Sequence, residues 1–258
     1  MPIHPTAIID QKTAIAPTVE IGPYCIVGEG VSIGAGTRLM SHVVLEGKLS
    51  IGEDNVFFPF CSCGVAPQDK KYRGEASETV IGNGNSIREF VTIHRGTEGG
   101  GMRTVIGNHN LVMAYVHVAH DVVIHNHTIL ANGVTFAGHV IVEDYANIGG
   151  LSAIHQFCRI GKHAIVGSRS VIKQNVLPFS QTASDHEVKV YGANRVGLQR
   201  SGFGPEAIEP LQSCFRLLSN AGLNTSQAVA RIHEEIPQTN EVKELLEFIR
   251  VSERGFVK

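Results

Sequence analysis

An aliphatic residue recurs at every sixth position through most of this chain of 258 residues. The recurrence is interrupted twice, and its lead positions are Ile3, Ile9, Ile15, Ile21, Val27, Ile33, Leu39, Leu45, Ile51 and Phe57, then Ile81, Ile87 and Ile93, then Ile106, Val112, Val118, Ile124, Leu130, Phe136, Val142, Ile148, Ile154, Ile160, Val166 and Ile172. Glycine often follows the lead, and the fifth position is small or β-branched in nearly every hexad. This period fits neither an α-helix nor an alternating strand. It predicts a short strand followed by a corner.

Three such sides close a triangular coil of about 18 residues, and successive coils stack at roughly the 4.8 Å spacing of neighbouring strands. The hexads then form about eight coils and a prism on the order of 40 Å tall. The pattern resembles the hexapeptide-repeat family of left-handed parallel β-helices. The left hand is implied by this resemblance, because parallel crossovers are otherwise almost always right-handed. The expected fold class is therefore an all-β solenoid with a small helical addition.

The two interruptions and the C-terminal part of the chain depart from the hexad pattern. Residues 64–80 and 98–105 are expected to leave the prism as loops, either to build a binding surface or as tolerated insertions. From about residue 192 the period becomes helical, with one helix opening at Gly204 and Pro205, a second capped by Asn224 or Thr225, and a third starting near Asn240. We expect a β-helix over 1–190 and a helical domain over 191–258 that caps the last coil.

Composition excludes several classes of protein. The net charge is −2, which does not suggest binding of nucleic acid, and no apolar run is long enough for stable insertion into a membrane. The first residues lack the basic and apolar regions of a secretion signal. Five cysteines without CxxC spacing predict reduced thiols in a cytoplasmic chain. Cys25, Cys61 and Cys158 fall on the inward fifth position of their hexads, and Cys214 is expected in the core of the helical tail.

Histidines gather in one part of the chain: nine of the 13 lie between His94 and His163. Stacked coils place residue i beneath residue i+18, so His120 lies beneath Gly138 and Gly138 beneath Gln156, while Asp121 lies beneath His139. This column offers a general base next to an amide that could stabilise an oxyanion. Asp121 could orient the imidazole. A metal site and purely structural histidines remain alternatives at this point.

Several runs of residues carry a more specific resemblance. In order along the chain they are Gln68-Asp69-Lys70-Lys71-Tyr72, Ile87-Arg88-Glu89-Phe90-Val91-Thr92-Ile93-His94-Arg95-Gly96-Thr97, His117-Val118-Ala119-His120-Asp121, Ala137-Gly138-His139 and His155-Gln156-Phe157-Cys158. Together with the helical tail, they resemble the acyl-(acyl carrier protein)–UDP-N-acetylglucosamine O-acyltransferases, which begin lipid A biosynthesis. The resemblance covers essentially the whole chain.

The resemblance implies transfer of a 3-hydroxyacyl group from acyl carrier protein to the 3-hydroxyl of UDP-N-acetylglucosamine. His120 matches the family's catalytic base, Gly138 the amide that receives the oxyanion, and Asp121 is its neighbour. The positions that match substrate-binding residues are Gln68, Asp69, Lys71, His117, His139, His155, Gln156, Asn194 and Arg200. Ser168 aligns with a residue that sets acyl-chain length. The resemblance further implies a homotrimer in the cytoplasm of a Gram-negative-type bacterium, with no metal and no cofactor.

Some residues depart from the family pattern. The segment Ala183-Ser184-Asp185-His186-Glu187 lacks the usual Gly-Asn pair, the residues around Tyr191 to Asn194 and Val196 differ, and Gln199 stands where lysine is frequent. These differences leave open a 3-amino sugar nucleotide, whose product would be an amide.

Three rival functions also use this type of prism. His117, His120 and His139 could bind zinc in a hydratase of the carbonic anhydrase kind. The related N-acyltransferase of the same pathway has an extra N-terminal domain, whereas this repeat begins at residue 3. A non-catalytic trimeric scaffold would leave His120 replaceable.

Overall fold

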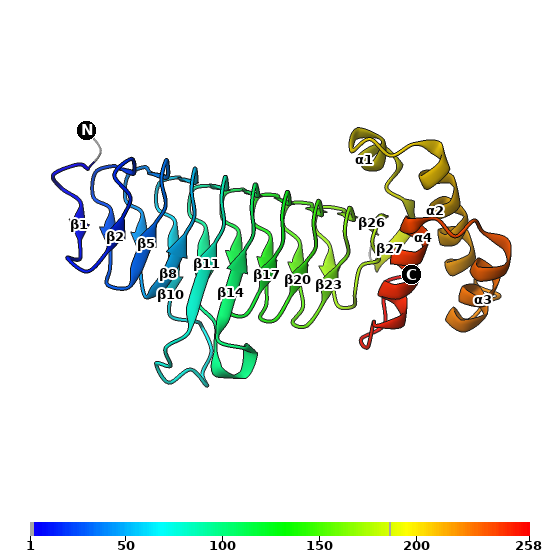
Figure 1. The fold of residues 1–258 in the computed structure, drawn as a ribbon. Helices are drawn as coiled ribbons and strands as arrows, with labels where there is room; N and C mark the ends of the chain where they lie inside the picture. Colours follow the sequence, from blue (N-terminus) through cyan, green and yellow to red (C-terminus); the bar gives the residue numbers. More distant parts are fainter. Residues whose placement is uncertain (1–2, 186) are drawn as a thin grey trace.

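The computed structural model describes residues 3–185 and 187–258, which form a long prism of stacked coils followed by a group of helices (Figure 1). Each of the prism's three sides is a sheet of parallel strands. The first sheet contains β1 (Ile8–Ile9), β4 (Ile26–Val27), β7 (Val44–Leu45), β10 (Ser62–Val65), β13 (Thr92–His94), β16 (His117–Val118), β19 (Thr135–Phe136), β22 (Ala153–Ile154) and β25 (Val171–Ile172). The second contains β2 (Ala14–Ile15), β5 (Val31–Ile33), β8 (Lys48–Ile51), β11 (Glu78–Ile81), β14 (Arg103–Ile106), β17 (Val123–Ile124), β20 (Ile141–Val142) and β23 (Arg159–Ile160). The third contains β3 (Glu20–Ile21), β6 (Arg38–Leu39), β9 (Val56–Phe57), β12 (Ser86–Ile87), β15 (Leu111–Val112), β18 (Ile129–Leu130), β21 (Asn147–Ile148), β24 (Ile165–Val166), β26 (Ser180–Asp185) and β27 (Glu187–Ala193).

The register of the strands confirms the predicted stacking of coils. In the first sheet, His117 pairs with Thr135, Thr135 with Ala153, and Ala153 with Val171. The two loops leave the prism on one side, between β10 and β11 and just before β14 (Figure 1). They are shorter than predicted, because residues 64–65, 78–80 and 103–105 belong to β10, β11 and β14. The second loop includes a short 3₁₀ helix, η1 (Glu98–Gly100). The parallel β-helix predicted from the hexads is therefore the fold of this chain.

The interior of the prism is filled by the lead and fifth residues of the hexads. Lead residues from Ile21 to Ile172 are buried, and so are Cys25, Cys61 and Cys158, as predicted for packing residues. Cys63 also occupies a buried lead position in β10, so the first stretch of hexads continues one repeat beyond Phe57. Because small and branched side chains point inward at every coil, few aromatic residues are needed to fill this core.

Most corners of the prism from Tyr24 onward bend through a residue in the left-handed backbone region, and many of these residues are not glycine. One corner stacks Tyr24, His42, Phe60, Phe90 and Tyr115 in a continuous column of rings. A second corner stacks His109, His127, Tyr145, His163 and Phe179. Ring stacking offsets the cost of the left-handed conformation. Part of the histidine cluster in the sequence therefore belongs to a structural corner.

A hairpin joins the prism to the helical tail. β26 pairs with β24 in parallel and with β27 antiparallel, so the boundary expected at residue 190 falls inside β27. The departing segment 183–187 lies in this hairpin, and His186 is outside the described residues. The helices are α1 (Arg195–Arg200), α2 (Pro205–Leu218), α3 (Thr225–Glu235) and α4 (Asn240–Arg250).

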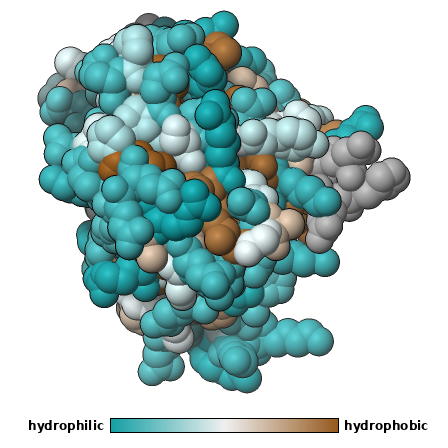
Figure 2. Space-filling model, turned by 90° about the vertical axis from the view of Figure 1, so that its right-hand side faces the viewer, coloured by the Kyte–Doolittle hydropathy of each residue, from teal (hydrophilic) through white to brown (hydrophobic). Residues whose placement is uncertain are grey.

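The starts of α2, α3 and α4 agree with the sequence prediction, and Asn224 closes a capping box with Gln227 at the start of α3. The helices share a second core that includes Leu211, Cys214 and Phe215. The end of the molecule that they form is mostly hydrophilic, as expected of a cap on a solenoid (Figure 2). None of the helices in the described ranges is long and apolar enough to span a membrane.

Candidate active site

A cleft of about 500 Å³ follows the first sheet from the coil of β16 to the coil of β25. It is lined by Gln68, His94, His117, Ala119, His120, Thr135, Phe136, Ala137, Gly138, Ala153, Ile154, His155, Gln156, Val171 and Lys173. The wall comes from equivalent positions of successive coils, because side chains of one column in a parallel β-helix lie above one another. Residues that are far apart in sequence thus meet in one elongated cavity.

His120 and Asp121 form a hydrogen-bonded pair at the edge of this cleft. His120 Nδ1 lies 2.8 Å from Asp121 Oδ2, and the two side chains are 17% and 1% exposed. A carboxylate can only accept a hydrogen bond, so the imidazole proton resides on Nδ1 and Nε2 keeps its lone pair. This arrangement suits a general base that is held in one tautomer.

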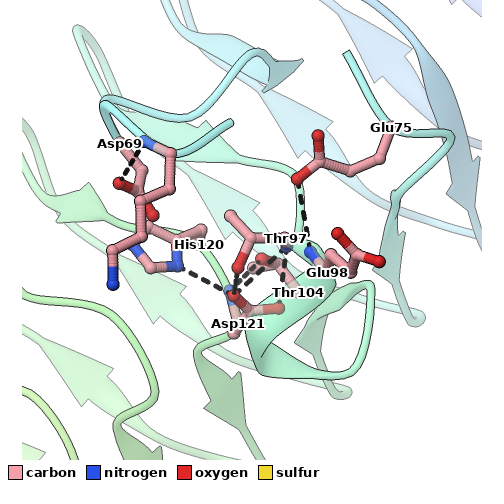
Figure 3. A network of polar contacts seen from close by, with 8 residues as sticks. Asp69, Glu75, Thr97, Glu98, Thr104, His120 and Asp121 are labelled. Atoms are coloured by element: carbon pink, nitrogen blue, oxygen red, sulfur yellow. Dashed lines mark hydrogen bonds and ion pairs between the residues drawn. The ribbon is translucent and has the colours of Figure 1, made fainter. Parts of the chain in front are cut away.

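Asp121 is held from below by the second loop and by the neighbouring strand. The Thr97 hydroxyl donates to Oδ2 over 2.5 Å, and the Thr97 N–H donates to Oδ1 over 3.0 Å. The Asp121 N–H in turn donates to the Thr104 hydroxyl over 2.8 Å. Figure 3 shows the contacts of His120 and Thr97 converging on the carboxylate, with His120 on one side and Thr97 on the other. Asp121 adopts a left-handed backbone with φ of 59°, which its corner position requires.

Gly138 lies directly against the ring of His120. A Cβ at residue 138 would fall 2.5 Å from His120 Cε1 and 2.8 Å from Nε2, so no other residue fits without moving the imidazole. Within residues 3–185 and 187–258, the Gly138 N–H donates no backbone hydrogen bond. An unused N–H beside the lone pair of Nε2 is a suitable donor for an oxyanion that forms during acyl transfer.

Three further histidines surround the pair and are neutral at neutral pH. Burial, with smaller contributions from His117 and His120, lowers the pKa of His94 to about 4. Burial also lowers the pKa of His117, whose Nδ1 lies 2.7 Å from the Thr92 hydroxyl. Burial lowers the pKa of His139 as well, an effect that the Asp121 carboxylate opposes. These side chains therefore offer hydrogen bonds to a ligand rather than positive charge.

The first loop brings a set of polar side chains to the cleft. Gln68 lines it, and Asp69 Oδ1 accepts a hydrogen bond from the Lys71 N–H over 2.9 Å. The Asp69 carboxylate is close enough to His139 to favour its protonated form. His155 and Gln156 line the cleft on the coil above Gly138. The loop and the stacked coils thus assemble the predicted residues Gln68, Asp69, His117, His120, Gly138, His139, His155 and Gln156 around one region. The predicted residue Lys71 is exposed on the first loop and is not among the residues that line the cleft.

Three predicted residues lie elsewhere in this single chain. Asn194 caps α1 through its contact with the Gly197 N–H, and its side chain also donates to the His163 carbonyl over 2.9 Å. Arg200 is exposed at the end of α1. Ser168 is exposed after β24, which belongs to the third sheet, whereas the cleft follows the first.

Comparison with known proteins decides the family. A relative in Thermodesulfovibrio yellowstonii, named acyl-(acyl carrier protein)–UDP-N-acetylglucosamine O-acyltransferase, is 50% identical over 256 residues and covers 99% of both chains. This chain belongs to that O-acyltransferase family. Its residues 175–257 match the family described as UDP-N-acetylglucosamine O-acyltransferase, domain 2, and residues 103–138 match the bacterial transferase hexapeptide family.

Solved structures agree with the O-acyltransferase assignment. A UDP-N-acetylglucosamine acyltransferase from Bacteroides fragilis has a TM-score of 0.96 and 38% identity, covering 99% of this chain and all of its own. A UDP-N-acetylglucosamine O-acyltransferase from Moraxella catarrhalis has a TM-score of 0.95 and 41% identity, covering 100% of both chains. The helical tail and the prism are therefore common to this chain and to members of the O-acyltransferase family.

The zinc hydratase alternative is not supported by this family membership. In the described part of the chain, one group of side chains could hold a metal ion, and it consists of His120, Asp121 and His139 rather than three histidines. His117 instead contacts Thr92.

The sequence prediction missed several residues of the site. Thr135, Ala153 and Val171 continue the column of His117, and Lys173 continues the column of His155, so the offset of 18 could have found them. His94 and Thr97 lie before the second loop, where that offset no longer applies. No sequence signal connected Thr97 with Asp121.

Proposed function

We propose that this chain transfers a 3-hydroxyacyl group from acyl carrier protein to the 3-hydroxyl of UDP-N-acetylglucosamine, the first step of lipid A biosynthesis. The observation that carries this proposal is the His120–Asp121 pair set against Gly138 in an elongated cleft. A thioester donor and a sugar hydroxyl need a base, an oxyanion donor and room for a long acyl chain. The names of full-length relatives supply the two substrates.

In the proposed reaction His120 acts as general base. The sugar oxygen attacks the thioester carbonyl, a C–O ester bond forms, and the C–S bond to the carrier breaks. His120 Nε2 accepts the hydroxyl proton and then delivers it to the leaving thiolate. Asp121 holds the Nδ1 proton and stabilises the transient imidazolium, while the Gly138 N–H receives the negative charge on the carbonyl oxygen.

The remaining polar residues of the cleft hold the substrates. Gln68 in the cleft, together with Asp69 and Lys71 further along the first loop, would contact the sugar nucleotide. Neutral His117 in the cleft and neutral His139 beside His120 would give hydrogen bonds next to it. His155 and Gln156 stand on the next coil, where the acyl chain would leave the reacting centre. The apolar residues Ala153, Ile154 and Val171 extend the cleft in the same direction, which suits a hydrocarbon chain.

The protein is proposed to act as a homotrimer. The cleft follows the flat side of one prism, and Asn194, Arg200 and Ser168 are not among its lining residues within one chain. A cyclic arrangement would bring the equivalent residues of a neighbouring subunit to each cleft. Light scattering should then give a mass near three times 27.8 kDa, whereas a monomer with full activity would contradict this arrangement.

Transfer by the purified protein is the test of the proposed function. With 3-hydroxyacyl carrier protein and UDP-N-acetylglucosamine, we expect a product whose mass increases by the acyl group and whose new bond is an alkali-labile ester. A matched reaction with the 3-amino sugar nucleotide distinguishes the amide-forming alternative. If only the 3-amino acceptor reacts, the proposed acceptor is wrong, and if neither reacts, the proposed transfer is wrong.

Ser168 is proposed to limit acyl-chain length from the neighbouring subunit. Its side chain is small and exposed, so Ser168→Met should fill space and shift the preferred donor to a shorter chain. Relative kcat/KM for donors of several lengths measures this shift, with Ser168→Gly as the control that leaves room. If both variants keep the wild-type preference for acyl-chain length, Ser168 does not limit that length.

A further inference from the structure

Thr97 occupies the N-cap position of a short helix, but its side chain does not cap that helix. It immediately precedes η1, where a threonine hydroxyl usually accepts a hydrogen bond from the first turn of the helix. Here the side chain makes no such capping bond. Its hydroxyl donates instead to Asp121 Oδ2 over 2.5 Å, and the residue is only 5% exposed. The hydroxyl is therefore committed to the carboxylate.

The same carboxylate oxygen serves both Thr97 and His120. Asp121 Oδ2 lies 2.5 Å from the Thr97 hydroxyl and 2.8 Å from His120 Nδ1, and the Thr97 N–H supports both carboxylate oxygens. Gly100 closes the remaining side, since a Cβ there would fall 1.9 Å from Asp121 Cγ. With 1% of the Asp121 side chain exposed, water does not replace a lost donor easily.

The second loop is itself held in place. The Thr97 carbonyl accepts hydrogen bonds from the Gly100 N–H over 3.1 Å and from the Met102 N–H over 2.9 Å. The Glu98 N–H donates to Glu75 Oε1 of the first loop over 3.3 Å, as Figure 3 also shows. The loop that supports Asp121 is therefore bonded to the loop that carries the proposed nucleotide-binding residues. Thr97 lies next to Glu98, the residue through which the two loops are bonded.

We infer that Thr97 is a positioning residue for the general base, acting through Asp121. This inference rests on the proposed function, in which His120 is that base. The Thr97 hydroxyl and N–H fix the rotation of the Asp121 carboxylate, so that Oδ2 faces His120 Nδ1. The imidazole is thereby kept with its proton on Nδ1 and with Nε2 directed toward the substrate hydroxyl. Thr97 does not touch the reacting atoms.

Loss of the hydroxyl also has a predictable pH effect. The groups that face His120 are Asp121 on its own turn, His139 from the coil above and His94 from the coil below, with Asp69 acting on His139. Without the Thr97 hydroxyl, more of the negative charge of Asp121 is available to an imidazolium. The acid side of the activity profile is then expected to move to higher pH.

The experiment compares Thr97→Val with wild type across pH. We expect kcat at neutral pH to fall about tenfold, the factor for one lost hydrogen bond to a charged group, with a smaller deficit at high pH and an unchanged KM for UDP-N-acetylglucosamine. Thr97→Ser, which keeps the hydroxyl, should restore most of the rate. Thr79→Val is the matched control, because Thr79 pairs with Thr104 in the adjacent coil and its buried hydroxyl has no partner among the described residues.

The outcomes separate this inference from the proposed function. If Thr97→Val keeps the wild-type rate and pH profile while His120→Ala is inactive, the positioning role is wrong and the base assignment stands. If Thr97→Val and Thr97→Ser lose activity equally at every pH, Thr97 has only a structural role and the inference is overturned. Should Thr97→Val fail to fold, Thr97→Ser and Thr97→Ala are compared instead, because these two variants differ only by the hydroxyl. A higher rate in Thr97→Ser than in Thr97→Ala then supports the positioning role. Equal rates in that pair would also overturn it.

Discussion

Gly138→Ala is expected to lower kcat by roughly 10²- to 10³-fold while the prism stays folded. The added methyl would lie 2.5 Å from His120 Cε1, 2.8 Å from Nε2 and 3.0 Å from Nδ1, well inside contact distance. The ring would have to leave its place, and the 2.8 Å contact with Asp121 would be lost. The methyl would also obstruct the approach of a carbonyl oxygen to the residue 138 N–H. Steady-state kcat and the thermal unfolding temperature measure the two parts of this prediction.

Gly28→Ala is the matched control for that substitution. A Cβ at Gly28 would meet its nearest neighbour, the Leu45 carbonyl oxygen, at 3.4 Å, which is ordinary contact. The same chemical change at another coil should therefore leave kcat within about twofold of wild type. Wild-type turnover by Gly138→Ala would mean that the position of the His120 ring against residue 138 is irrelevant to the reaction.

Much of the fold could be predicted because, in a regular hexad repeat, the position of a residue in the sequence determines its position in the stacked coils. Once the lead residues set the phase, strand pairing at an offset of 18 follows, and it correctly stacked Gly138 over His120. Inward packing of Cys25, Cys61 and Cys158 followed from the same phase. A repetitive core leaves few alternative registers, since a slip of one residue would turn every buried side chain outward.

The rest of the site could not be predicted because it depends on where the repeat fails. The second loop changes the sequence offset between paired residues of β13 and β16 from the regular 18. The contact between His94 and His117 therefore could not be predicted from the spacing of the repeat. The contact between Thr97 and Asp121 depends on how the loop returns to the prism. The hairpin β26–β27 likewise follows no hexad pattern. The helix α1 has six residues, too few to show a helical period in the sequence.

The histidine cluster illustrates both sides of this comparison. Five of its members, His94, His117, His120, His139 and His155, belong to the cleft region. His109, His127 and His163 instead stack with Tyr145 at a corner, where a left-handed residue with a flat ring is favoured. Residue type alone does not distinguish these groups, and neither does a corner position, since His139 is also left-handed and stacks on Phe157. What distinguishes them is the corner of the coil on which each histidine lies. This distinction supplies the control for the central experiment.

His120→Ala is expected to lower kcat by about 10²- to 10⁴-fold, the usual contribution of a general base. KM for UDP-N-acetylglucosamine should change little, because the first loop and the neighbouring histidines, which are proposed to hold the sugar nucleotide, are unchanged. The vacated space beside Gly138 and Asp121 should admit free imidazole, which we expect to restore part of the rate. His127→Ala, in the corner stack, removes an imidazole from the same part of the chain and should retain full activity.

The rate of 3-hydroxyacyl transfer from acyl carrier protein to UDP-N-acetylglucosamine by His120→Ala, with both substrates saturating, tests the central claim most directly. A loss of at least about a hundredfold relative to wild type and to His127→Ala is the predicted result. A folded His120→Ala protein that turns over within about twofold of wild type would contradict the assignment of His120 as the base.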